Sequence, residues 1–138
     1  MTNLPADAAG ALAVGWATVE LDRAARDLSD LLASGEAFVE APSSEALGAR
    51  CRVGAAAAGG GVRIVLLEPE TEGRLSATLA RHGEGWVATW VTAPITPSSS
   101  VARSSGARPG PFGEERLVLG GPATGPHRLV VEAVPSRP

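Results

Sequence analysis

The feature that most constrains the fold is the stretch of residues 61–92, GVRIVLLEPETEGRLSATLARHGEGWVATWVT. It begins with an apolar run over 62–67, which is typical of a strand buried on both faces of a sheet. A segment with helical spacing follows over 72–82, and a second extended run covers 86–92. The stretch therefore predicts a strand, a helix and a strand, with the helix joining two halves of the chain.

The residues before this joint predict a strand, a helix and three more strands. The predicted elements are an extended segment over 11–20, a helix from Leu21 to Ser34-Gly35, and strands over 37–41, 47–53 and 62–67. Apolar residues of the helix recur at helical spacing, and the glycine ends it. Pro42 breaks the first of the three strands, since proline cannot donate to a ladder.

The residues after the joint predict the same order of elements. They are a strand over 85–92, a helix over 97–105, an edge strand or loop over 107–112, and strands over 115–119 and 128–134. The run Ser98 to Ser100 favours a loop as readily as a helix. We therefore predict an α+β fold in which two βαβββ modules form a curved mixed sheet. The chain is expected to be a single domain over 1–138, with modules at 11–68 and 85–135 and a linking helix within 69–84.

Composition excludes several classes of function. Net charge is −3 and no basic stripe occurs, so no nucleic-acid partner is expected. No apolar run approaches the ~20 residues of a membrane span, and the N-terminus lacks the pattern of a signal peptide. The single cysteine, Cys51, cannot form an internal disulfide, which predicts a cytoplasmic protein. The chain has no Lys or Tyr, which excludes Schiff-base lysine and acid–base tyrosine chemistry.

Three segments together resemble the vicinal oxygen chelate superfamily, the group of glyoxalases, bleomycin-resistance proteins and methylmalonyl-CoA epimerases. They are AVGWATVELDRAA over 13–25, VRIVLLEP over 62–69 followed by LARHGEG over 79–85, and the closing hairpin over 117–134. The resemblance covers most of the chain apart from about 93–114, and it implies the curved two-module fold predicted above.

The resemblance also implies four metal-ligand positions, one on each of four strands. They fall here on Ala13, Val65, Ala88 and Glu132. Methyl and isopropyl groups cannot donate an electron pair, and one carboxylate cannot hold a catalytic metal. We therefore predict no bound metal and no cofactor. His82 at a helix end and His127 before the last strand are expected to have surface or capping roles.

If these four positions face a cavity, strand alternation assigns further residues to its lining. The predicted ligand-binding residues are Ala13, Arg63, Val65, Trp86, Ala88, Trp90 and Arg128, with Glu132 as the candidate catalytic carboxylate. Two tryptophans beside small residues predict a slot for a flat ligand. The alternative is that both tryptophans simply fill the core, and that Glu132 pairs with an arginine. Trp16 has the opposite parity and is expected to pack under a helix.

The leading hypothesis is a metal-free protein that binds a small, planar organic molecule in the sheet cavity. The bleomycin-resistance type, which sequesters an antibiotic without chemistry, is the nearest analogy within the resembling group. The alternative is a metal-independent isomerase, epimerase, cyclase or lyase of secondary metabolism that uses Glu132 for proton transfer. A purely structural role stays open. The resemblance also implies a homodimer.

Overall fold

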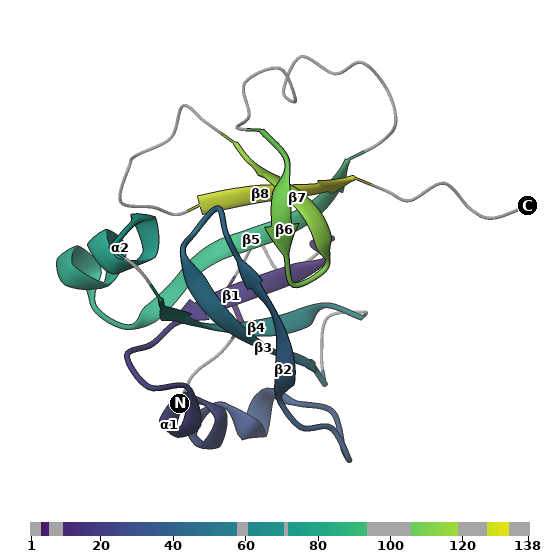
Figure 1. The fold of residues 1–138 in the computed structure, drawn as a ribbon. Coiled ribbons are helices and arrows are strands. Elements are labelled where there is room, and N and C mark those ends of the chain that lie inside the picture. Colours follow the sequence, from purple (N-terminus) through teal and green to yellow (C-terminus); the bar gives the residue numbers. More distant parts are fainter. Residues whose placement is uncertain are drawn as a thin grey trace, which may run out of the picture.

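The structure of the chain is a computed structural model that describes residues 4–5, 10–57, 61–70, 72–93, 106–118 and 127–132. Within them the strands form one eight-stranded sheet in the order β2-β3-β4-β1-β5-β8-β7-β6 (Figure 1). The strands are β1 (Ala13–Ala17), β2 (Val39–Ser44), β3 (Ala49–Ala55), β4 (Arg63–Pro69), β5 (Gly85–Ala93), β6 (Arg108–Gly110), β7 (Gly113–Leu117) and β8 (His127–Glu132).

The second four strands repeat the pairing of the first four. β1 pairs parallel with β4, and β5 pairs parallel with β8, while β1 and β5 meet antiparallel at the centre of the sheet. The outer pairs β2–β3, β3–β4, β6–β7 and β7–β8 are all antiparallel. The predicted α+β fold with a curved mixed sheet is confirmed. The helix predicted over 97–105 lies outside the described residues.

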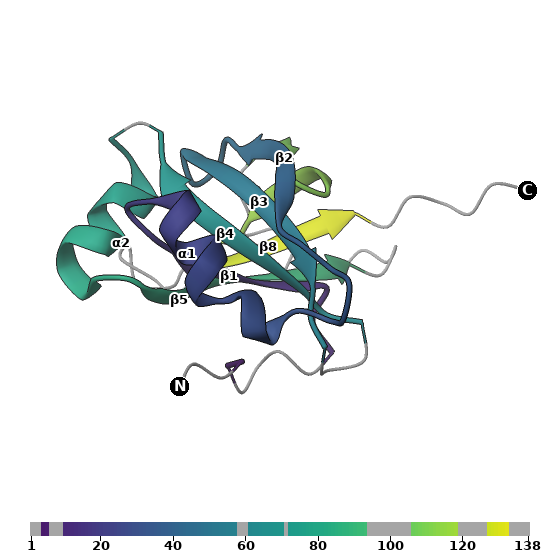
Figure 2. The ribbon, with the colours of Figure 1, turned by 90° about the horizontal axis from the view of Figure 1, so that it is seen from below.

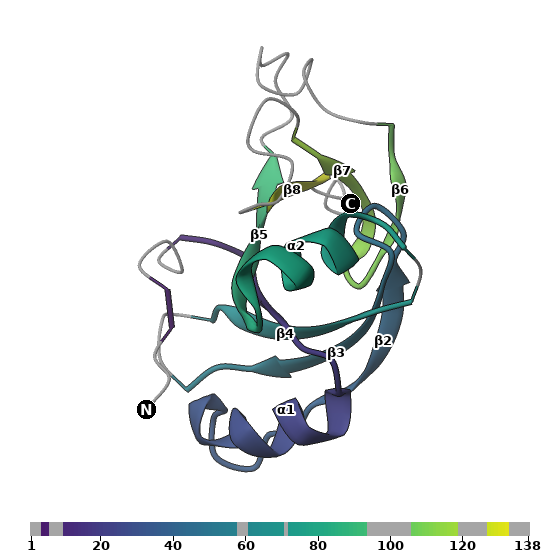
Figure 3. The same ribbon diagram turned by 90° about the vertical axis from the view of Figure 1, so that its left-hand side faces the viewer.

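The two α-helices of the described residues are α1 (Leu21–Asp27), which continues into a 3-10 turn over Ser29–Leu31, and α2 (Arg74–His82). α1 lies along the outer, convex side of the sheet (Figure 2). α2 lies on the concave side, across the open end of the curved sheet that faces the viewer in Figure 3. Neither helix of the described residues has the length and apolar character that a membrane span needs.

The first edge strand differs from its prediction. Pro42 was expected to end the strand over 37–41, but β2 runs from Val39 through Pro42 to Ser44. Because β2 is an edge strand, a proline there costs no ladder bond on the open side. A register shift between Ala41 and Ser44 marks a local irregularity where the proline is accommodated.

Buried apolar residues form two clusters on the two faces of the sheet. The interior core lies on the concave face and includes Ala13, Val65 and Trp90 together with Leu75 of α2. The outer core lies under α1 and includes Val14 and Ile64 with the helix residues Leu21, Ala24 and Leu28. Alternation along β1 and β4 sends neighbouring residues to opposite clusters, as expected for strands covered on both faces.

The curvature brings the two edges of the sheet together. The Glu45 backbone N–H, directly after β2, donates to the Pro109 carbonyl of β6 at 3.1 Å. The Arg108 guanidinium lies 3.5 Å from the Glu45 carboxylate. The concave face therefore becomes an interior that both halves of the chain enclose.

Candidate functional site

The interior contains a carboxyl group, Glu115 of β7, which is only 1% exposed. Trp90 of β5 donates its Nε1–H to Glu115 Oε1 at 2.8 Å. Ser44 of β2 donates its hydroxyl to Glu115 Oε2 at 2.6 Å. The carboxyl group is thus held from both halves of the chain, by one donor on each oxygen.

The surroundings of Glu115 favour its protonated form. Burial raises the pKa of the Glu115 carboxyl, and the hydrogen bonds from Ser44 and Trp90 oppose that rise only in part. Among the described residues no cation forms a salt bridge with Glu115. An unpaired buried charge is costly unless a partner or a proton neutralises it. A carboxyl group whose pKa is raised in this way is a stronger base in its ionised form, which is the property that general acid–base chemistry needs.

Two glycines allow this arrangement because a side chain at either position would collide with it. A Cβ atom at Gly15 of β1 would lie 2.7 Å from Trp90 Cζ3 and 2.9 Å from Leu67 Cδ1. A Cβ atom at Gly110 of β6 would overlap the Glu115 carboxyl. The Trp90 ring is therefore seated directly on the β1 backbone, and the β6 backbone lies directly against the carboxyl group.

Trp90 fills the space that the small residues of β1 leave. The ring is fully buried and contacts Phe112 edge-on, with ring centroids 6.1 Å apart. Trp90 therefore occupies the position that the alternative prediction gives it, as a residue that fills the core.

The prediction that Trp86 shares the face of Trp90 is wrong. Gly15 pairs with Ala88 while Trp16 pairs with Trp86, so the ladder skips Val87 and β5 carries a bulge there. Val87 and Ala88 both belong to the interior core, and the alternation reverses on the far side of the bulge. Trp86 instead packs against the outer core with Trp16, whose ring centroid is 5.1 Å away. The predicted two-tryptophan slot does not form.

Three of the four positions that the resemblance assigns to metal ligands lie together on the interior face. Ala13, Val65 and Ala88 are all buried members of the interior core. Their shared face was predicted correctly, and their side chains have no donor atom for a metal. Within the described part of the chain, no group of three or more His, Cys, Asp or Glu side chains could hold a metal ion.

The phase predicted for the last strand is off by one residue. β8 contributes Leu129 and Val131 to the interior core, whereas Arg128 is exposed and pairs with Thr89. The prediction was wrong because the alternation was counted from Glu132, a residue that the resemblance implies faces the interior. Glu132 ends β8 opposite Ala93, and its side chain lies outside the described residues.

Arg63 is the other predicted polar contact of the ligand. It begins β4 opposite Ala13. It is two residues before Val65, so strand alternation puts both on the same face, and its side chain is exposed. Its role as a contact for a ligand stays a prediction.

His127 is a buried residue rather than the surface residue that was predicted. It opens β8 opposite Ala88, is 4% exposed, and has its Nε2 atom 2.9 Å from Thr78 Oγ1 of α2. The Thr78 hydroxyl also donates to the Arg74 carbonyl at 2.9 Å. Burial, and secondarily the charge of Arg74, lowers the pKa of His127. The contact fastens α2 to the second half of the chain.

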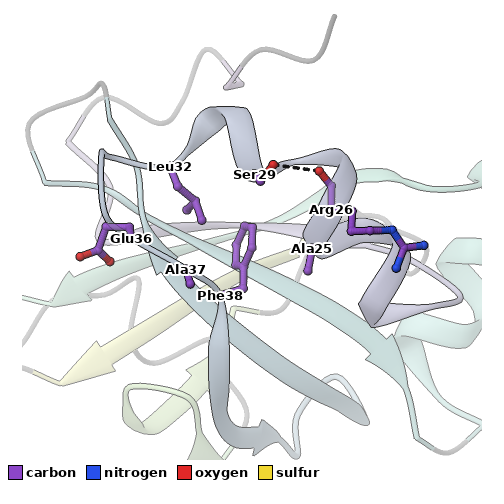
Figure 4. A pocket seen from close by; sticks show the side chains of 7 residues that line it. All are labelled: Ala25, Arg26, Ser29, Leu32, Glu36, Ala37 and Phe38. Carbon is purple, nitrogen blue, oxygen red and sulfur yellow. Dashed lines mark hydrogen bonds between the residues drawn. The ribbon is translucent and has the colours of Figure 1, made fainter.

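An outer pocket of about 380 Å³ lies beside α1 (Figure 4), and its lining residues do not include Glu115. Its lining residues are Ala25, Arg26, Ser29, Leu32, Glu36, Ala37 and Phe38. The Ser29 hydroxyl is already used, because it donates to the Arg26 carbonyl at 2.9 Å. In Figure 4 the Arg26 guanidinium points away from the Phe38 ring, so the pocket gathers no convergent polar groups.

Sequence reasoning missed Glu115, which lies in the polar run Gly113-Glu114-Glu115-Arg116. Glu114 and Glu115 look alike in sequence, but Glu114 is exposed and Glu115 is buried. The available signal was alternation, since Glu115 is two residues before the buried Leu117 and shares its face. A charged residue in phase with a core leucine is unusual, and it indicates either a paired carboxylate or a functional one.

Solved structures with this fold include several methylmalonyl-CoA epimerases. The epimerase from Mycobacterium tuberculosis has a TM-score of 0.71 at 23% identity, covering 91% of this chain and 89% of its own. A Streptomyces coelicolor methylmalonyl-CoA epimerase in complex with 2-nitronate-propionyl-CoA has a TM-score of 0.68 at 18% identity, covering 91% and 97%. A hypothetical protein from Bacillus halodurans C-125 has a TM-score of 0.65 at 15% identity, covering 93% and 96%.

These identities establish a shared fold and no more than that. No protein-family model matches the sequence, and a search of curated proteins finds no match. The structure therefore has the architecture of the methylmalonyl-CoA epimerases. Three of the four positions that the resemblance assigns to metal ligands hold the apolar residues Ala13, Val65 and Ala88. A buried carboxyl group, Glu115, lies on β7.

Proposed function

We propose that the protein is a metal-independent enzyme that transfers a proton at a carbon next to a carbonyl group, with Glu115 as the acid–base group. The supporting observation is the burial of this single carboxyl among apolar residues with neutral hydrogen-bond donors on both oxygens. A raised carboxyl pKa makes the ionised form a stronger base. The carboxylate takes the proton, the C–H electron pair passes into an enolate, and the carboxylic acid then returns the proton to the same carbon.

The substrate class follows from the reaction and from the structures that share the fold. Among the epimerase structures, one from Streptomyces coelicolor is in complex with 2-nitronate-propionyl-CoA, and another is in complex with methylmalonyl-CoA. A nitronate, like an enolate, has a planar carbon conjugated with oxygen that carries the negative charge. We therefore propose a small acyl thioester or related carbonyl compound as substrate. Glu115 replaces Glu132 in this role because Glu115 is the carboxyl group that the described residues place in the interior.

The test is proton exchange at the carbon next to the carbonyl, followed by NMR in D₂O. The panel contains methylmalonyl-CoA, simpler branched acyl thioesters and short 2-substituted 3-oxo acids. Deuterium incorporation is expected for at least one of them. Glu115→Gln is expected to lower its rate by about a hundredfold or more, because general acid–base groups contribute about 10²–10⁴. Glu114→Gln, one residue away and exposed, is the matched control and keeps the rate.

Glu132→Gln decides between the two carboxylates. Loss of exchange in Glu132→Gln with full exchange in Glu115→Gln would assign the chemistry to Glu132. No exchange with any compound of the panel would contradict the enzyme proposal as a whole.

The second candidate function is binding without chemistry, as in sequestration of an antibiotic. The observation in its favour is that both Glu115 oxygens already accept hydrogen bonds in the resting protein. Trp86 lies outside the interior, so the planar ligand originally predicted loses one of its two stacking surfaces. Calorimetric titration that shows binding, together with no deuterium incorporation into the bound compound, would support this candidate over the enzyme.

A further inference from the structure

Glu115 is almost completely buried, so a substrate can reach it only if part of the enclosure moves. β6 and β2 lie over the carboxyl group, and they are the two edges of the sheet rather than neighbours within it. Each strand is held to its neighbours within the sheet by a ladder of backbone hydrogen bonds, whereas β2 and β6 are not ladder neighbours of each other. The meeting point of the two edges is therefore the place where the interior can open at least cost.

Three polar contacts of the described residues join β2 and the residue after it to the β6–β7 hairpin at this point. The first is the backbone bond from the Glu45 N–H to the Pro109 carbonyl, and proline has no N–H with which to extend it into a ladder. The second is the Arg108–Glu45 ion pair, which is exposed and therefore screened by water. The third is the Ser44–Glu115 hydrogen bond, which is short and fully buried. A buried hydrogen bond to a carboxyl group is the strongest of the three.

Gly110 ties the position of β6 to the same carboxyl group. Its Cα lies so close to Glu115 that a methyl group there would overlap the carboxyl oxygens. Gly110 is buried and is paired with Gly113 at the tip of the β6–β7 hairpin. Movement of the Glu115 side chain and movement of β6 are therefore coupled by contact.

We propose that the Ser44–Glu115 hydrogen bond is a latch that holds β2 against the β6–β7 hairpin and controls entry to the interior. As a gate for substrate this role rests on the proposed function of Glu115. Its role in holding β2 against the hairpin rests only on the contacts described above and does not depend on the proposed function. When the latch is released, β6 moves away from β2 and uncovers the carboxyl group, while the central strands β1, β4, β5 and β8 stay paired.

The latch is tested without any ligand, with Cys51 as the reporter. This thiol lies on β3 directly opposite Ala41 of β2, is buried, and has its pKa raised by burial to about 12. Labelling with a disulfide reagent therefore reports opening next to β2. Ser44→Ala is expected to speed labelling by about tenfold, since removing one partner of a buried hydrogen bond leaves the other partner unsatisfied, at a cost that corresponds to that factor. Ser43→Ala, whose hydroxyl makes only an exposed contact with Glu70, is the matched control.

Hydrogen exchange separates release of the latch from general loss of stability. In Ser44→Ala the amides of β2 and β6 are expected to lose protection by about tenfold, while those of β1 and β4 keep theirs. Gly110→Ala reaches the same opening by a steric route, with Gly85→Ala as control because a Cβ there meets nothing within 4 Å. Uniform loss of protection across the sheet, or labelling no faster than in Ser43→Ala, would overturn the latch.

A substrate arm tests the gate separately. If Ser44→Ala opens the edge and also speeds deuterium incorporation at limiting substrate, the latch gates the proposed site. If it opens the edge but no panel compound exchanges even then, the latch stands and the proposed function of Glu115 fails. If exchange occurs at the same rate in the wild type and in an opened Ser44→Ala, substrate enters elsewhere and the gating role is overturned.

Discussion

At the residue scale, Trp90 decides what the interior can hold. The small residues of β1 were predicted to leave room for a ligand, and the structure places the Trp90 ring on Gly15 in that room. The sequence could not distinguish a space filled by a side chain from a space filled by a ligand. The room above a glycine in a strand suits an indole ring and a bound molecule equally well. What sequence did identify correctly is the pairing of a large residue on β5 with small ones on β1.

Gly15→Ala is expected to destabilise the protein by about 1–3 kcal/mol, the usual range for inserting a methyl group into a packed core. The reason is the overlap of the new Cβ with the Trp90 ring and Leu67. Urea unfolding followed by circular dichroism gives the difference in free energy. Gly85→Ala, also on this strand pair but with nothing near its Cβ, serves as the control. Equal unfolding midpoints for the two variants would contradict the close seating of the ring.

At the element scale, the order of strands and helices along the chain was predictable, and the phase of β5 and β8 was not. Element types and their repeat followed from apolar periodicity, since buried strands and amphipathic helices leave different spacings. The bulge at Val87 left no comparable signal, because a Val-Ala pair fits a regular strand equally well. One extra residue reverses every side chain beyond it, which is why Trp86 was placed on the wrong face. The inward-facing residues of β8 were predicted wrongly for a related reason, because the alternation along that strand was counted from one assumed position, Glu132.

The contact between α2 and β8 predicts how stability depends on pH. Because the pKa of His127 in the folded chain is below its ordinary value near 6.5, the unfolded chain binds more protons there. Stability from this residue is therefore fully present above about pH 6.5 and is lost as the pH falls below it. Urea unfolding at pH 7.5 and 5.5 should show a larger loss for the wild type than for His127→Gln. A smaller loss in the wild type would show that the histidine is protonated in the fold.

At the scale of the whole molecule, the interior core joins the two halves. It includes Cys51 and Leu67 from the first half and Trp90, Leu117 and Leu129 from the second. The single domain over 1–138 stays a prediction, and a shared core is what that prediction requires, because neither half can bury its concave face alone. The predicted homodimer stays a prediction, and sedimentation velocity at several concentrations would test it.

The shared core predicts that both halves unfold in one transition. In a Trp16→Phe/Trp86→Phe variant the fluorescence of the buried Trp90 follows the second half, and accessibility of the Cys51 thiol follows the first. Their midpoints in urea should coincide, as two-state unfolding requires. Leu117→Ala should lower both midpoints together, although Cys51 lies in the other half. Two separated transitions would contradict the single domain.

The meeting of β2 and β6 also bears on solubility. The open edge of a sheet is a template on which a second chain can add a strand and begin aggregation. Here the two edges cover each other where they meet, and each carries a proline, Pro42 and Pro109, that cannot donate a backbone hydrogen bond. Changes that separate the edges would therefore expose two templates at once, so the same contacts that enclose the interior also protect the protein from aggregation through added strands.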